Sequence, residues 1–251
     1  MGTTAVNPRV LSKPATVVPG RRFDHIFFSA TALMMAVTVY VGFAPTYYMA
    51  GIFRAPLPGT IIHIHGAAFT CWILLLITQT SLASAGRVDI HRRLGLLGFC
   101  LASVMVVLGV LAATDRLARA SAPPGSDPYF FYIIPLGDMF IFAALILFAY
   151  RFRSNPAAHK RIIYVATVGL LIAAIARWPI SLVHRKAPHA AIASYIFLLL
   201  LAAYDLWSTR RIHRATLWAS GFLIFIQQVR LPIGRTAAWH SFAGWVQSIA
   251  R

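Results

Sequence analysis

Residues 91–114 read HRRLGLLGFCLASVMVVLGVLAAT, and this stretch decides the fold. It begins with a histidine and two arginines and then continues from Leu94 to Thr114 without a charged side chain. A helix that rises about 1.5 Å per residue crosses the roughly 30 Å hydrocarbon core of a bilayer in about 20 residues. The stretch is therefore predicted to be a transmembrane helix whose basic end lies at the cytoplasmic surface.

The same pattern recurs along the chain. His25, His159 and His213 also stand at the start of long apolar segments. Seven segments are long enough to span a bilayer, at about residues 26–48, 61–84, 94–114, 130–150, 162–183, 190–207 and 215–234. The predicted fold is an all-α, polytopic membrane bundle of seven transmembrane helices.

The composition supports a membrane protein and sets its orientation. With 59% hydrophobic and 12% charged residues and a mean hydropathy of +0.72, the chain does not form a water-soluble globule. Its 23 basic residues outnumber 6 acidic ones, and most of the bases outside the N-terminal tail lie in short connections, so anionic lipid headgroups are the expected partner and nucleic acid is not. They gather before span one and after spans two, four and six, which predicts an inside N-terminus and an outside C-terminus in a bacterial inner membrane.

Three regions are predicted. Residues 1–24 form a disordered cytoplasmic tail without the cleavage site of a signal peptide, and residues 25–234 form the membrane domain. Residues 235–251 carry Trp239, Phe242 and Trp245 at helical spacing and are predicted to form an amphipathic helix on the outer surface. All six acidic residues are aspartates, so a mechanism that requires glutamate is excluded.

Polar side chains inside the spans form the first candidate site, because each costs a few kcal/mol in lipid unless it has a partner or a use. In the outer half these are His63 or His65, Asp138, Arg177 and Arg230. They indicate a polar pocket for a metal, a haem or a small anion. The alternative is a structural network in which Asp138 neutralises one arginine while the other reaches the headgroups.

His63 and His65 are the candidate metal ligands, but they point about 200° apart on a helix. His65 shares its helical face with Trp72 and Gln79, so it is the favoured histidine. Trp72, Gln79, Asp138 and Gln227 are predicted to line the ligand pocket, with Gln228 beside them. Asp205 is predicted to form an interfacial salt bridge with its sequence neighbours Arg210 and Arg211.

Two further histidine groups are candidates. His25, His91, His159 and His213 form an inner ring that either supplies axial ligands to a b-type haem or anchors the helix ends at the interface. His184, His189 and His240 lie in outer loops without the close ligand spacing of a metal site, so chance placement is the better interpretation.

Five stretches carry a resemblance. They are GFAPTYY at 42–48, HIHG at 63–66, GRVDIHRRLG at 86–95, PLGD at 135–138 and AHKR at 158–161. Together they resemble a family of uncharacterised multi-pass bacterial membrane proteins. More distantly, the spaced histidines resemble those of transmembrane b-type cytochromes. That resemblance implies haem b with His65 as outer ligand, His91 and His159 as candidate inner ligands, and Arg177 and Arg230 as propionate partners.

Three hypotheses for function follow. The first is electron transfer or redox chemistry through a haem or a transition metal in the bundle. The second is a carrier or receptor without cofactor, in which Arg177 and Arg230 bind a small anionic or amphipathic ligand. The third is a scaffold or assembly subunit of a membrane complex. The sequence argues against a retinal protein, because Lys13, Lys160 and Lys186 all lie outside the predicted spans.

Overall fold

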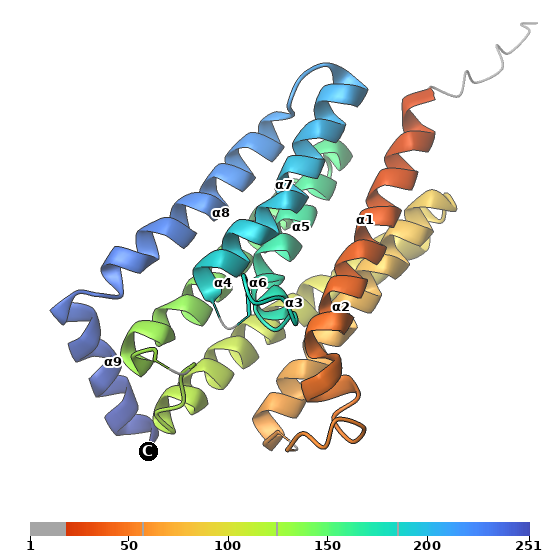
Figure 1. Cartoon of the computed structure of the whole chain (residues 1–251). Coiled ribbons are helices and arrows are strands. Elements are labelled where there is room, and N and C mark those ends of the chain that lie inside the picture. The colour runs from red at the N-terminus through yellow and green to blue at the C-terminus, as the bar shows by residue number, and fades with distance from the viewer. Residues whose placement is uncertain (1–18, 57, 124, 185) are drawn as a thin grey trace, which may run out of the picture.

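The computed structural model describes residues 19–251 except 57, 124 and 185, and it leaves the side chains of 19–22 undescribed. The regular structure of these residues is helical throughout (Figure 1). Most of the predicted cytoplasmic tail lies outside the described residues, and the first helix begins at Pro19. The elements are α1 (Pro19–Phe43), the π-helical turn η1 (Ala44–Tyr48), α2 (Thr60–Ser84), α3 (Val88–Ala118), α4 (Pro128–Arg151), α5 (Pro156–Leu170), α6 (Ile172–Ile175), α7 (Ala187–Thr209), α8 (Arg214–Ile233) and α9 (Ala237–Ala250).

Six segments of the described chain are long and apolar enough to cross a bilayer. They are Phe23–Tyr48, Thr60–Ser84, Val88–Ala118, Pro128–Arg151, Pro156–Ile175 and Ala187–Thr209. The chain is therefore a multi-pass integral membrane protein, because helices satisfy their own backbone hydrogen bonds in lipid. The seventh predicted span corresponds to α8, which has 20 residues and is not one of these six. It nevertheless packs against α4, α5 and α7 in the same bundle.

Successive long helices run in opposite directions (Figure 1). We call the end at which α1 begins the proximal end and the end at which α1 stops the distal end. Polar caps fix where several helices start. Asp127 accepts hydrogen bonds from the backbone N–H groups of Tyr129 and Phe130 at the distal start of α4, and Asn155 accepts one from Ala158 at the proximal start of α5.

The core lies around the span Pro156–Ile175, which comprises α5 and α6 and is 72% buried over its apolar window, the highest share of the six. Phe142 and Leu145 from α4, Ile162 from α5 and Leu223 from α8 are completely buried there. These side chains pack together and hold α4, α5 and α8 against one another. Since α8 is part of this core, its polar residues are held at fixed positions relative to α4.

The prediction of the fifth span is wrong over its last part. Instead of one helix over 162–183, the structure has α5 to Leu170, the short α6, and turns after Ile175. Pro179 explains part of this difference, because proline and the residue before it disfavour helix. The break lies against α1 at Gly42, where an added Cβ would lie 2.3 Å from the carbonyl oxygen of Ala174.

The C-terminal helix α9 docks on the protein by one face. Ala243 and Gln247 are buried against α3 and α4, and the Gln247 Nε2 donates to the Leu117 carbonyl at 2.7 Å. The opposite face exposes Phe242 and Trp245. The predicted amphipathic helix therefore exists over 237–250, and it packs along the distal ends of two membrane helices.

Candidate functional site

A small pocket with three polar residues in a mainly apolar lining lies between α4, α7 and α8 towards the distal end. The Arg230 Nη1 on α8 donates to the Asp138 Oδ1 on α4 at 2.6 Å and to the Ile134 carbonyl at 2.8 Å. Both charged side chains are largely buried, with 6% and 14% of their surface exposed. Asp138 lies ten residues after Pro128, which is roughly 15 Å along the helix. The structure thus pairs two of the residues that the sequence grouped.

Gly137 permits this pairing. A Cβ at this position would lie 2.9 Å from the Arg230 Cδ, so glycine lets the arginine lie flat on α4. The neighbouring Pro135 lies inside α4 and contributes no N–H to the helix. The PLGD stretch at 135–138 is therefore the part of α4 against which the Arg230 side chain packs.

Gln227 is the unusual residue of this pocket. Its side chain is 2% exposed, yet neither its Oε1 nor its Nε2 has a hydrogen-bond partner among the described residues. The Arg230 Nε is also buried without a partner in this part of the chain. Unpaired buried polar atoms are rare in proteins, because each one costs the full penalty of leaving water. The pocket therefore offers two free donor groups and one free acceptor.

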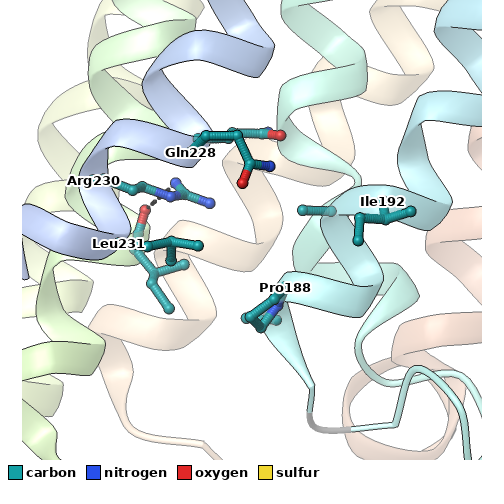
Figure 2. A pocket seen from close by; sticks show the side chains of 9 residues that line it. Pro188, Ile192, Gln228, Arg230 and Leu231 are labelled. Atoms are coloured by element: carbon teal, nitrogen blue, oxygen red, sulfur yellow. Dashed lines mark hydrogen bonds between the residues drawn. The ribbon is translucent and has the colours of Figure 1, made fainter.

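The cavity beside these groups measures about 40 Å³. Figure 2 shows Gln228 and Arg230 on the α8 side of it, facing Pro188 and Ile192 on α7. The Gln228 Nε2 donates to the Tyr195 hydroxyl at 3.2 Å and so bridges the two helices. Since a buried water needs roughly 10–15 Å³ of such space, the cavity fits two or three waters or one small polar group.

The histidines of α2 differ in their surroundings. His63 is exposed and lies beside the Tyr47 ring, with 5.7 Å between the ring centroids. His65 is partly buried, stacks on Phe69 at 4.1 Å, and has a buried Nδ1 without a hydrogen-bond partner among the described residues. His65 is therefore the histidine of this pair that faces protein. The predicted pocket residue Trp72 is packed in the core, where its Nε1 donates to the Thr167 hydroxyl at 3.2 Å.

Arg177 occupies a different place from Arg230. Its guanidinium lies over the Phe43 ring, with 4.6 Å from Cζ to the centroid, and its Nη1 donates to the Ala173 carbonyl at 2.5 Å. It thus covers the end of the broken helix α6 and packs on α1. Neither contact involves Asp138 or the cavity, so the pocket is built around one of the two predicted arginines.

Three histidines of the predicted inner ring bind backbone groups at the proximal end. The His91 Nδ1 lies 3.4 Å from the Gln79 carbonyl, and the Gln79 Nε2 donates to the His91 carbonyl at 3.2 Å. The His159 Nδ1 lies 2.9 Å from the Ala149 carbonyl. The His213 Nδ1 accepts from the Ala215 N–H at 3.0 Å, as an N-cap of α8.

These contacts show that the Nδ1 atom is a hydrogen-bond donor in His91 and His159 and an acceptor in His213. An imidazole that donates from Nδ1 to a carbonyl presents Nε2 as a free acceptor, as His91 and His159 do. His213 uses its acceptor nitrogen for the cap and must be neutral to do so. Burial accordingly lowers the pKa of His213 below its ordinary value, with the Arg161 charge as a further cause. His25, the fourth histidine of the predicted ring, follows Asp24 in the sequence and is partly buried. Its side chain has no hydrogen bond among the described residues.

The prediction for Asp205 is wrong. This residue does not pair with Arg210 and Arg211 at the interface, but is fully buried and bound to Arg161 of α5. Its Oδ1 accepts from the Arg161 Nε at 2.9 Å and Nη2 at 2.5 Å, and its Oδ2 accepts from the Thr216 hydroxyl at 2.6 Å. The prediction was wrong because it chose the bases that are nearest along the chain. Asp205 faces the bundle, whereas Arg210 and Arg211 are exposed.

A second carboxylate completes this proximal junction. Asp24 of α1 binds the Lys160 Nζ at 2.6 Å and accepts from the Tyr204 hydroxyl at 2.6 Å. Asp24 and Asp205 thus join α1, α5, α7 and α8. The partners Lys160, Arg161 and Thr216 were not predicted. In the sequence they are recognisable only as bases near the start of α5 and a hydroxyl near the start of α8.

The remaining histidines form no cluster in the described chain. His184 and His240 each contact a nearby backbone carbonyl, of Trp178 and Gly234 respectively, and His189 is exposed. The His240 Nε2 also lies 3.3 Å from the Asp127 carboxylate. Within the part of the chain that the structure describes, no three histidine, cysteine or acidic side chains converge as metal ligands.

The polar cavity between α4, α7 and α8 is therefore the candidate site, since it combines an ion pair, unpaired buried groups and space. No protein family, curated protein or solved structure matches this chain.

Proposed function

We propose that this membrane protein binds a small ligand through a polar group in the pocket between α4, α7 and α8. The observation that carries the proposal is the side chain of Gln227, which is buried beside the Asp138–Arg230 ion pair with both polar atoms unpaired among the described residues. A group that pairs with this amide would remove a penalty of about 1–3 kcal/mol per unsatisfied atom. The function is thus that of a carrier or receptor.

The ligand-free network is neutral, because Asp138 compensates Arg230. This differs from the hypothesis in which two free arginines attract an anion, since Arg177 packs on Phe43 instead. The small cavity accepts a head of a few atoms, and any larger part of the ligand extends beyond it. In a scaffold without a ligand, the unpaired Gln227 amide would lower the stability of the protein with no compensating interaction.

The test compares molecules that co-purify with three versions of the protein. Wild type, Gln227→Leu and the matched control Gln79→Leu are isolated in parallel from the same membranes, and bound small molecules are identified by mass spectrometry. Gln79 is a partly buried glutamine whose Oε1 also lacks a partner in the described chain, but it lies on α2. We expect one compound to be present with wild type and with Gln79→Leu and absent from Gln227→Leu. Identical contents in all three preparations would overturn the proposal.

A second candidate is a haem or a metal held by His91 and His159, because each Nδ1 binds a carbonyl and neither Nε2 has a hydrogen-bond partner among the described residues. Such a group would supply one-electron transfer. His65 does not fit the same centre, because it lies fourteen residues, or roughly 21 Å, from Gln79, which contacts His91. An absorbance spectrum without a Soret band, together with metal content at background, would exclude this candidate.

We also propose that the proximal end faces the cytoplasm, that α8 is the seventh span, and that the membrane is a bacterial inner membrane. The bases at the proximal helix ends and in the connections between them support this orientation, since positive charge stays inside. They are Arg87, Arg92, Arg93, Arg151, Arg153, Arg210 and Arg211. An impermeant thiol reagent applied to intact cells should label Ser126→Cys at the distal end and spare Ser84→Cys at the proximal end. The reverse pattern would contradict the orientation.

A further inference from the structure

We infer that the ligand is a single-chain amphiphile with an uncharged carboxamide or protonated carboxylic acid head, which enters sideways from the lipid between α7 and α8. This inference rests on the proposed function and specifies the ligand class of the same pocket. Three features of the pocket support it: its charge balance, its free hydrogen-bonding atoms and its rim.

The charge balance favours an uncharged head. Arg230 and Asp138 form a one-to-one ion pair at 2.6 Å, and both side chains are nearly removed from solvent. Arg230 is the charged residue of the pocket lining and is already paired with Asp138, so a charged head would add a third buried charge without a counter-charge of its own. Buried charges are tolerated when they are paired, so the pocket discriminates against ionised heads.

The unpaired atoms select the kind of uncharged head. The Gln227 amide presents a carbonyl oxygen and an NH₂ group that are both free of partners in the described chain. A carboxamide or a protonated carboxyl group carries the complementary donor and acceptor in the same geometry, so it can form two parallel hydrogen bonds with the amide. An ester or an ether has no donor and leaves the Gln227 oxygen unpaired. The Arg230 Nε, which also lacks a partner among the described residues, is a second free donor group for the same head.

The rim of the pocket points to entry from the lipid. Ile192 of α7 lines the opening and is 62% exposed, and Pro188 and Gln228 are exposed beside it. In Figure 1, α8 leans away from α7 towards the distal end, and Figure 2 shows the labelled residues on both sides of the resulting space. In a bilayer the apolar part of this rim, formed by Pro188 and Ile192, would face acyl chains, so a ligand tail can remain in hydrocarbon while the head enters.

The experiment uses the full chain in lipid nanodiscs and octanamide that carries a photoreactive diazirine on its tail. After illumination, mass spectrometry locates the labelled peptides. We expect labelling of α7 and α8 near Ile192, reduced at least about tenfold by Gln227→Leu and unchanged by Gln79→Leu, because two hydrogen bonds are lost in the former. Labelling that does not depend on Gln227 would overturn this inference, whereas the proposed function is decided by the molecules that co-purify with wild type and with Gln227→Leu.

Competition on the wild-type protein tests the inference separately. Unlabelled octanamide should suppress labelling at a concentration at least about tenfold below that of octanoate, which is charged at neutral pH. Acetamide has the same head without the tail and should compete poorly. If Gln227-dependent labelling is displaced best by octanoate, and equally well at about pH 7 and about pH 9, where the protonated form is about a hundredfold rarer, the uncharged head is refuted. If acetamide competes as well as octanamide, entry from the lipid is refuted, and in both cases ligand binding itself stands.

Discussion

Replacing Asp205 with asparagine tests the buried ion pair that holds α5, α7 and α8 together. The carboxylate is 0% exposed and Arg161 is 4% exposed by side chain. It accepts four hydrogen bonds, two from Arg161, one from the Thr216 hydroxyl and one from the His213 backbone N–H. The asparagine side chain would keep the shape of the carboxylate but lose its charge, so the guanidinium would stay buried without a counter-charge.

The expected loss is about 3–5 kcal/mol of unfolding free energy, the cost of removing one partner of a buried ion pair. This magnitude separates two explanations. Interhelical hydrogen bonds in membrane proteins average about 0.6 kcal/mol each, so four ordinary bonds would contribute only about 2 kcal/mol. A loss above that value identifies the uncompensated charge of Arg161 as the dominant effect of the Asp205→Asn change.

Reversible unfolding in mixed micelles, followed by circular dichroism, measures this difference. The control is Asp89→Asn, because the Arg87–Asp89 pair is exposed, with a separation of 3.8 Å, and should contribute less than about 1 kcal/mol. The double variant Arg161→Met with Asp205→Leu should be more stable than Asp205→Asn, since it leaves no buried charge at this junction. The reasoning is refuted if Asp205→Asn unfolds like wild type, or if the double variant is the least stable protein.

Three further predictions use the same unfolding assay. Gln227→Leu should stabilise the ligand-free protein by about 1–3 kcal/mol, because it removes buried polar atoms without partners in the described chain, and a loss of stability would show that the amide is satisfied. His213 caps α8 as a neutral imidazole whose pKa is lowered mainly by burial. Its contribution is therefore complete above the unfolded value of about 6.5 and is lost as the pH falls through the lowered folded value, and His213→Asn should flatten this pH dependence. Gly42→Ala should destabilise the protein by about 1–3 kcal/mol, because its Cβ would lie 2.3 Å from the Ala174 carbonyl oxygen in α6. Gly51→Ala is its control, since a Cβ there meets no described atom within 4 Å, and equal effects of the two would contradict the close approach.

The helices are predictable because lipid imposes one solution on the chain. Apolar segments of sufficient length must form helices, so hydropathy locates the six candidate spans and the segment that forms α8. It predicts the fifth span too long, since composition alone does not show where a helix breaks. The break after Leu170 lies against Gly42 of α1, which is distant in sequence.

Pairing between helices is less predictable. Depth alone groups Asp138 with Arg230, and the structure joins them at 2.6 Å. Depth also places Arg177 in this group, yet it packs on Phe43, because similar depth does not imply adjacent helices. The sequence neighbours of Asp205 mislead for a related reason. Depth follows from the position along a helix, whereas partners depend on which faces meet.

The two buried ion pairs differ in a way that bears on function. At the proximal end, both carboxylate oxygens of Asp205 accept hydrogen bonds, and neither Arg161 nor Thr216 has a buried side-chain atom left unpaired. At the distal end, α8 carries Arg230 and Gln227, whose Nε and amide lack partners in the described chain and lie beside a cavity. Both sites include residues of α8, so the contrast occurs between two ends of one helix. A structural junction reaches full satisfaction within the protein, and a binding site leaves groups free for its ligand, which is why we assign stability to the first site and recognition to the second.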